Sequence, residues 1–132
     1  MNIVVDSNIV FSAILNSQNV LGHLLINGSK YFRFFTIGLL KEEILKHKTK
    51  ILKISGLSQE QFERSFHTVT SRIFFIDDIV LNDSEIEKAL ELVSNIDIND
   101  ALFVALTIHL NGKLWTGDKK LTLGLKIKVS LN

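Results

Sequence analysis

The sequence predicts an α/β fold: a three-layer α/β/α domain in which helices flank a central, mainly parallel β-sheet. Short apolar runs typical of buried strands alternate with longer segments whose apolar residues recur at helical spacing. Parallel strands need a crossover connection, which is usually a helix, so this alternation favours parallel pairing. The 132 residues contain no linker and no internal repeat. We therefore expect a single domain over residues 1–132.

The expected elements follow one another closely. Strands are expected at residues 2–5, 31–36, 72–76, 113–116 and 126–130, where apolar and aromatic side chains dominate. Helices are expected at residues 7–15, 20–26, 38–47, 59–70, 82–93 and 101–110. Ser58 with Gln61 three residues later is a capping-box pattern, which predicts a helix start. Prolines are absent, so turns must be made by Gly, Asn, Asp and Ser, as at Asn27-Gly28 and Asn111-Gly112.

Composition narrows the functional classes. Hydrophobic residues make up 46% of the chain and charged residues 22%, the balance of a globular protein. The absence of cysteine excludes disulfides, a cysteine nucleophile and thiolate zinc sites, and it agrees with a cytoplasmic location. The apolar stretches are too short for a signal peptide or for the roughly 20 residues of a membrane span, so a soluble protein is expected. Neither a nucleotide-binding phosphate loop nor a GxSxG elbow is present.

The basic residues give no global attraction to nucleic acid, because the formal net charge is only +1. Lysines cluster in residues 41–53 and 113–128, and their simplest interpretation is a solvated face. The histidines lie on expected helices without the paired spacing of metal ligands, so we interpret them as surface or boundary residues. They are His23, His47, His67 and His109.

Acidic residues follow two of the expected strands, Asp6 after the first and Asp118 after the strand at 113–116. Ligands of open α/β sheets bind outside the carboxyl ends of the strands. Each acid also has an ordinary interpretation: Asp6 as a helix cap, Asp100 as a first-turn acid that suits the helix dipole, and Asp118 as a turn residue. Gathered in one pocket, such carboxylates would repel one another unless a cation compensates. Oxygen ligands alone favour Mg²⁺ or Mn²⁺ and fit zinc poorly.

Four short segments resemble, in the same order along the chain, the motifs of the PIN-domain family. The resemblance covers essentially the whole chain. The segments are Val4-Val5-Asp6-Ser7-Asn8, then Leu40-Lys41-Glu42-Glu43-Ile44, then residues 97–106 from Asp97-Ile98-Asn99-Asp100 onward, and finally Leu114-Trp115-Thr116-Gly117-Asp118.

The resemblance implies a ribonuclease that uses Mg²⁺ or Mn²⁺ to hydrolyse phosphodiester bonds of RNA. Glu43 is preferred to Glu42 because Ile44 follows it, as the family pattern expects. Asp97 lies three residues before Asp100, so one of the two can cap the helix while the other binds metal. The implied acidic quartet is Asp6, Glu43, Asp100 and Asp118, with Asp97 as an additional metal ligand, Asn8 and Thr116 as supporting residues, and Lys41, Lys119 and Lys120 as contacts to RNA phosphates.

Several alternatives stay open at this point. Many bacterial PIN domains are toxins that a small antitoxin protein neutralises, and they commonly form homodimers, so both partners are expected here. A housekeeping or processing ribonuclease and a non-catalytic interaction module are the competing classes. A receiver-like signalling domain is less favoured, since Asp77-Asp78 is its only mid-chain acceptor candidate and comes late in the chain. Trp115 and Phe103 are interpreted as core residues in preference to base-stacking platforms.

Overall fold

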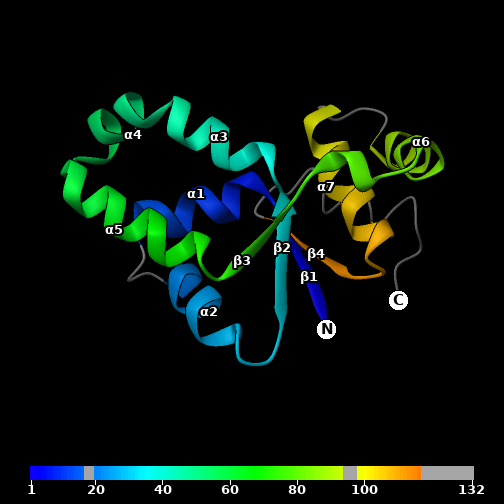
Figure 1. Ribbon diagram of the computed structural model, residues 1–132, viewed down its shortest axis with the longest axis horizontal. Coiled ribbons are helices and arrows are strands. Elements are labelled where there is room, and N and C mark those ends of the chain that lie inside the picture. Colours follow the sequence, from blue (N-terminus) through cyan, green and yellow to red (C-terminus); the bar gives the residue numbers. More distant parts are fainter. Residues whose placement is uncertain (17–19, 94–97, 117–132) are drawn as a thin grey trace.

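A parallel β-sheet lies at the centre of the molecule (Figure 1). The computed structural model describes residues 1–16, 20–93 and 98–116, and all statements below concern these residues. Its four strands are β1 (Asn2–Val5), β2 (Arg33–Ile37), β3 (Ile73–Ile76) and β4 (Lys113–Trp115), in the order β3-β2-β1-β4. All three pairings are parallel. The α/β class and the parallel sheet are confirmed.

Helices cover both faces of this sheet, which makes three layers. Helices α1, α2 and α5 lie together on one side in Figure 1, and α7 lies on the other side with α6 packed behind it. Helix α7 contacts β1, β2 and β4. The helices are α1 (Ser7–Leu15), α2 (Val20–Gly28), α3 (Leu39–Lys46), α4 (Lys48–Ser55), α5 (Gln59–Thr70), α6 (Asp83–Leu92), α7 (Ile98–His109) and the short 3-10 helix η1 (Asp78–Val80).

The core forms around β1, whose last two residues, Val4 and Val5, are fully buried. A central parallel strand is covered on both faces, so its side chains are apolar on both. Val10 of α1 packs into the core from one layer, and Leu106 of α7 packs into it from the other. The sheet end at which β1 stops is therefore fixed by buried apolar contacts on both sides.

Helix α4 is the main element that the sequence did not indicate. Its sequence carries three lysines and none of its residues is buried, although Ile51 and Leu52 pack partly against the core. The helix ends at Gly56, whose φ of 75° lies in the left-handed region that favours glycine. Helix α2 also runs through Gly28, beyond its expected end. The strand expected at residues 126–130 lies outside the described residues.

The helix ends follow the local chemistry that the sequence predicted. The Ser58 hydroxyl accepts a hydrogen bond from the Gln61 N–H at 3.1 Å, and the Gln61 side chain accepts one from the Ser58 N–H at 2.9 Å, which confirms the capping box. Between α7 and β4, a Cβ on Gly112 would stand 2.5 Å from the Asn2 carbonyl oxygen. Only glycine lets this turn approach β1 so closely, and the approach places β4 beside β1.

No single helix in the described part of the chain is long and apolar enough to cross a membrane; α1 and α2 reach that length only together, with a bend of 104° between them.

Candidate functional site

Asp6 lies where β1 ends, and it begins α1 as its N-cap residue. Its side chain is only 2% exposed. One carboxylate oxygen, Oδ1, accepts a hydrogen bond from the Ile9 N–H at 3.0 Å, and the other, Oδ2, accepts one from the Thr116 hydroxyl. The capping role is therefore confirmed, and Thr116 makes a hydrogen bond to Asp6 of the kind that its predicted supporting role requires. Metal binding by Asp6 stays a prediction.

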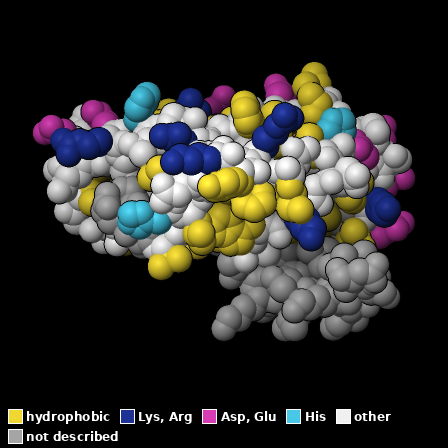
Figure 2. Space-filling model, turned by 90° about the horizontal axis from the view of Figure 1, so that it is seen from below, with side chains coloured by type: hydrophobic (Ala, Val, Ile, Leu, Met, Phe, Trp, Pro, Cys, Tyr) yellow, Lys and Arg dark blue, Asp and Glu magenta, His cyan; other side chains and the backbone are white. Residues whose placement is uncertain are grey.

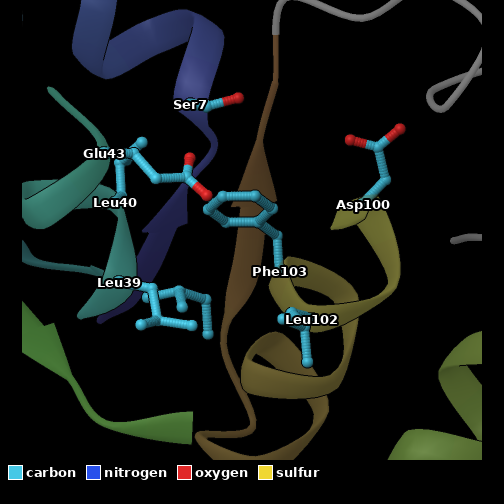
Figure 3. Close-up of a pocket in the computed structure, with 8 residues that line it drawn as sticks. Ser7, Leu39, Leu40, Glu43, Asp100, Leu102 and Phe103 are labelled. Atoms are coloured by element: carbon cyan, nitrogen blue, oxygen red, sulfur yellow. The ribbon is translucent and has the colours of Figure 1, made fainter. Parts of the chain in front are cut away.

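Glu43 and Asp100 line the same pocket, a cavity of about 220 Å³ at the carboxyl edge of the sheet. Ser7, directly after Asp6, is the third polar residue of its lining. In Figure 3, Glu43 points from α3 toward the ring of Phe103, and Asp100 lies on the other side of that ring, on the first turn of α7. Two acids that are distant in sequence are thus brought to one pocket.

Helical spacing explains why Glu43, and not Glu42, reaches this pocket. Leu40 and Ile44 are buried and anchor α3 to the core. Glu43 is three residues after Leu40 and so lies near the same side of the helix, whereas Glu42 is turned away. The remaining lining is apolar and comes from β2, α3 and α7: Ile37, Leu39, Leu40, Leu102 and Phe103.

The pocket's donors suit a hard divalent cation. Within residues 1–16, 20–93 and 98–116, no three acidic or histidine side chains gather closely enough to enclose a metal ion. Glu43 and Asp100 nevertheless provide carboxylate oxygens from two elements. Mg²⁺ is commonly held by one or two carboxylates while it keeps several waters and contacts substrate phosphates. Glu43 and Asp100 therefore fit a hard divalent cation, with oxygen as the only donor atom.

Some of the other residues singled out from the sequence lie within the described ranges, and some lie outside them. Asn8 is exposed on the first turn of α1, and Lys41 is exposed on α3, with its Nζ 5.7 Å from the centroid of the Phe75 ring. Phe103 is buried at 7% exposure and Trp115 packs against the core, as expected. Four further predicted residues lie outside the described ranges: Asp97, Asp118, Lys119 and Lys120.

One buried polar residue next to the Asp6 backbone was not predicted from the sequence. Thr36 of β2 is fully buried, and its hydroxyl donates a hydrogen bond of 2.7 Å to the carbonyl oxygen of Val5, the residue before Asp6. The only available signal was a hydroxyl within the otherwise apolar run of residues 34–37. That signal does not reveal which carbonyl the hydroxyl meets.

Comparison with known protein families identifies the fold. The family model of the PIN domain matches residues 4–130. The chain belongs to the PIN-domain family. The structure is also similar to a chain in the crystal structure of VapBC2 from Rickettsia felis bound to a DNA fragment from their promoter, with a TM-score of 0.66 and 21% sequence identity over 93% of this chain and 92% of that chain. This second likeness concerns the fold alone. No curated protein gives a significant match.

Proposed function

We propose that this PIN domain is a metal-dependent endoribonuclease that hydrolyses RNA phosphodiester bonds at the pocket between α1, α3 and α7. The observation that carries the proposal is the placement of Glu43 and Asp100 on one pocket, beside the strand end that bears Asp6. PIN domains are typically nucleases, and the family membership of this chain supports the same chemistry here. All four acidic residues of the motifs are present in the sequence, which argues against a PIN-like interaction module that has lost its catalytic activity.

The proposed ligands of Mg²⁺ or Mn²⁺ are Asp6, Glu43, Asp100 and Asp118, with Asp97 as an additional one. When bound, the metal would supply an activated water and stabilise the charge that develops on the leaving oxygen. The chain itself orients the donors: Thr116 and the Ile9 N–H hold the two oxygens of Asp6, and buried Leu40 and Ile44 hold the helix that carries Glu43. Lys41, Lys119 and Lys120 are proposed to contact RNA phosphates, which adds affinity without sequence selection.

The biological setting proposed is that of a toxin in a toxin–antitoxin pair, acting in the cytoplasm as a homodimer. Many bacterial PIN domains have this role, and the similarity in fold to VapBC2 supports it. A neighbouring reading frame for a small protein, together with growth arrest that Asp6→Asn relieves, would favour the toxin. Absence of both would favour a housekeeping or processing ribonuclease.

The test compares two adjacent glutamates of α3. Mn²⁺ binding is measured by titration calorimetry on the parent protein, on Glu43→Gln and on the matched control Glu42→Gln, and each protein is then given a mixed RNA pool with and without EDTA. We expect EDTA-sensitive cleavage by the parent. In Glu43→Gln alone, metal affinity and activity should fall by at least the roughly 10- to 100-fold that follows loss of a residue that merely orients a metal ligand. A folded parent that binds no Mn²⁺ and cuts no RNA would instead be a non-catalytic interaction module.

A further inference from the structure

Two buried polar residues lie near the end of β1. Among the described residues, Asp6 and Thr36 are the only polar or charged residues classed as buried, at 2% and 0% exposure. Asp6 directly follows β1, and Thr36 belongs to the neighbouring strand β2, 30 positions further along the sequence. Burying a polar group is costly unless it is hydrogen-bonded, so a pair of such groups at one strand end calls for a specific explanation.

The hydrogen bond of Thr36 acts on the peptide unit that carries Asp6. The Thr36 hydroxyl donates to the Val5 carbonyl oxygen at 2.7 Å. The N–H of the same peptide unit belongs to Asp6 and donates to the Trp115 carbonyl oxygen at 3.3 Å. Because a peptide unit is planar, fixing its oxygen from β2 and its N–H from β4 fixes the orientation of the whole plane.

This anchoring extends beyond the regular pairing of the strands. The register of β1 with β2 runs from Asn2 opposite Arg33 to Val4 opposite Phe35. The Thr36 hydroxyl reaches the carbonyl of the next residue, where the chain leaves the sheet and turns into α1. The orientation of this peptide unit sets the direction in which the Asp6 side chain projects from the backbone.

We propose that Thr36 is a positioning residue for Asp6, which holds the Val5–Asp6 peptide plane so that the Asp6 carboxylate stands in its working orientation. This inference rests on the proposed function, because it gives Asp6 a catalytic task. Thr116 holds the carboxylate itself, and Thr36 holds the backbone from which it projects. Partners that orient a metal ligand in this way usually change metal affinity or activity by roughly 10- to 100-fold when removed.

The competing explanation is that Thr36 is only a well-satisfied core residue. Its loss would then lower stability without changing the behaviour of the folded protein. Thr70 offers a matched control, because its hydroxyl also donates a 2.7 Å hydrogen bond to a backbone carbonyl, that of Phe66 in α5, away from the pocket. Thr70→Val therefore removes the same kind of bond elsewhere in the molecule.

The experiment compares the parent with Thr36→Val, Thr36→Ser and Thr70→Val. For each folded protein, Mn²⁺ affinity, kcat and KM for RNA cleavage, and hydrogen exchange of the Asp6 amide are measured. We expect Thr36→Val to lower kcat roughly 10-fold or more with little change in KM, to weaken Mn²⁺ binding and to speed exchange at Asp6. Thr36→Ser keeps the hydroxyl and should restore most of the activity, and Thr70→Val should match the parent in all three readings.

Parent-like kcat, Mn²⁺ affinity and Asp6 exchange in Thr36→Val would overturn the proposal, and so would a Thr36→Ser variant as impaired as Thr36→Val. If Thr36→Val does not fold, Thr36→Cys takes its place, since a thiol of similar size is only a weak donor. A parent protein that neither binds Mn²⁺ nor cuts RNA would overturn the proposed nuclease function instead. The exchange rate at Asp6 would still decide whether Thr36 fixes that peptide.

Discussion

Asp6 and Asp77 occupy the same local position in two parts of the sheet, yet only Asp6 lies in the candidate site. Each follows a parallel strand, β1 or β3, and each caps the helix that comes next. The Asp6 side chain accepts from the Ile9 N–H and the Asp77 side chain from the Ile79 N–H, both at 3.0 Å. Asp6 is 2% exposed, whereas Asp77 is exposed to solvent.

The neighbouring strands make this difference. Strand β1 lies between β2 and β4. From the β2 side, the Thr36 hydroxyl donates a hydrogen bond to the carbonyl oxygen that precedes Asp6, and from the β4 side, the Thr116 hydroxyl donates one to the Asp6 carboxylate. Strand β3 lies at the edge of the described sheet, with β2 as its only neighbour there. The carbonyl before Asp77, that of Ile76, accepts a hydrogen bond from the Gly38 N–H at 2.7 Å. A strand followed by an aspartate is therefore a helix start in both places, and its sheet neighbours decide whether it can also be a site.

The largest effect that we expect is on the rate of RNA cleavage, which should depend on Asp6 and not on Asp77. Asn caps a helix about as well as Asp, so Asp6→Asn and Asp77→Asn should both fold. We expect Asp6→Asn to abolish cleavage of an RNA that the parent cuts, a loss on the order of 100-fold or more, because a negatively charged metal ligand is gone. Asp77→Asn should cut at the parent's rate. Initial cleavage rates with Mn²⁺ and melting curves test this, and full activity in Asp6→Asn would sink the proposed mechanism.

Much of the fold could be predicted from local patterns. The alternation of apolar strands and amphipathic helices indicated the parallel sheet, and the Ser58–Gln61 capping box indicated the start of α5. Helix α4 was missed because it is rich in lysine and only Ile51 and Leu52 pack partly against the core, so its apolar stripe is too weak for helix prediction. Its end at Gly56 was the only strong local signal.

The sequence allowed the acidic residues of the candidate site to be predicted, but not the hydrogen bonds around them. Acids at strand ends pointed to Asp6, and the resemblance to the PIN-domain motif selected Glu43 because Ile44 follows it; the structure places Glu43 in the pocket lining. Thr36 could not be found, because a threonine in an apolar strand is an ordinary β residue until the register shows which carbonyl it meets. Such contacts depend on tertiary packing between segments that are distant in sequence.

A second difference between Asp6 and Asp77 should appear in stability. Asp6→Ala removes the acceptor of two hydrogen bonds at a position that is 2% exposed, and we expect a loss of roughly 2 to 3 kcal/mol in the free energy of unfolding. Asp77→Ala removes one exposed capping bond, so about 1 kcal/mol or less should be lost. Urea unfolding of both variants measures the two values. Equal losses would mean that the sheet neighbours of Asp6 add nothing to its anchoring.

Glu85 is a third carboxylate that caps a helix, and its substitution should have the smallest effect, a change in how stability depends on pH. It belongs to the capping box of α6, where it accepts from the Asn82 N–H at 3.0 Å, and it also contacts His109 Nδ1 at 3.0 Å. The Asn82 hydrogen bond, helped by His109 and opposed by burial, holds the pKa of Glu85 below its ordinary value of 4.5.

A lowered pKa in the folded state means that ionised Glu85 stabilises the fold at pH values above 4.5, and that this contribution is lost as the pH falls through the lowered pKa. Glu85→Gln should therefore flatten the dependence of the unfolding free energy on pH below about 4.5, and the exposed Glu87→Gln on the same helix is the control. Urea titrations between about pH 3 and pH 6 measure both slopes. Since Glu85 lies outside the pocket lining, both variants should cleave RNA like the parent at neutral pH, and lost activity in Glu85→Gln would show that a capping acid can serve the site from a distance.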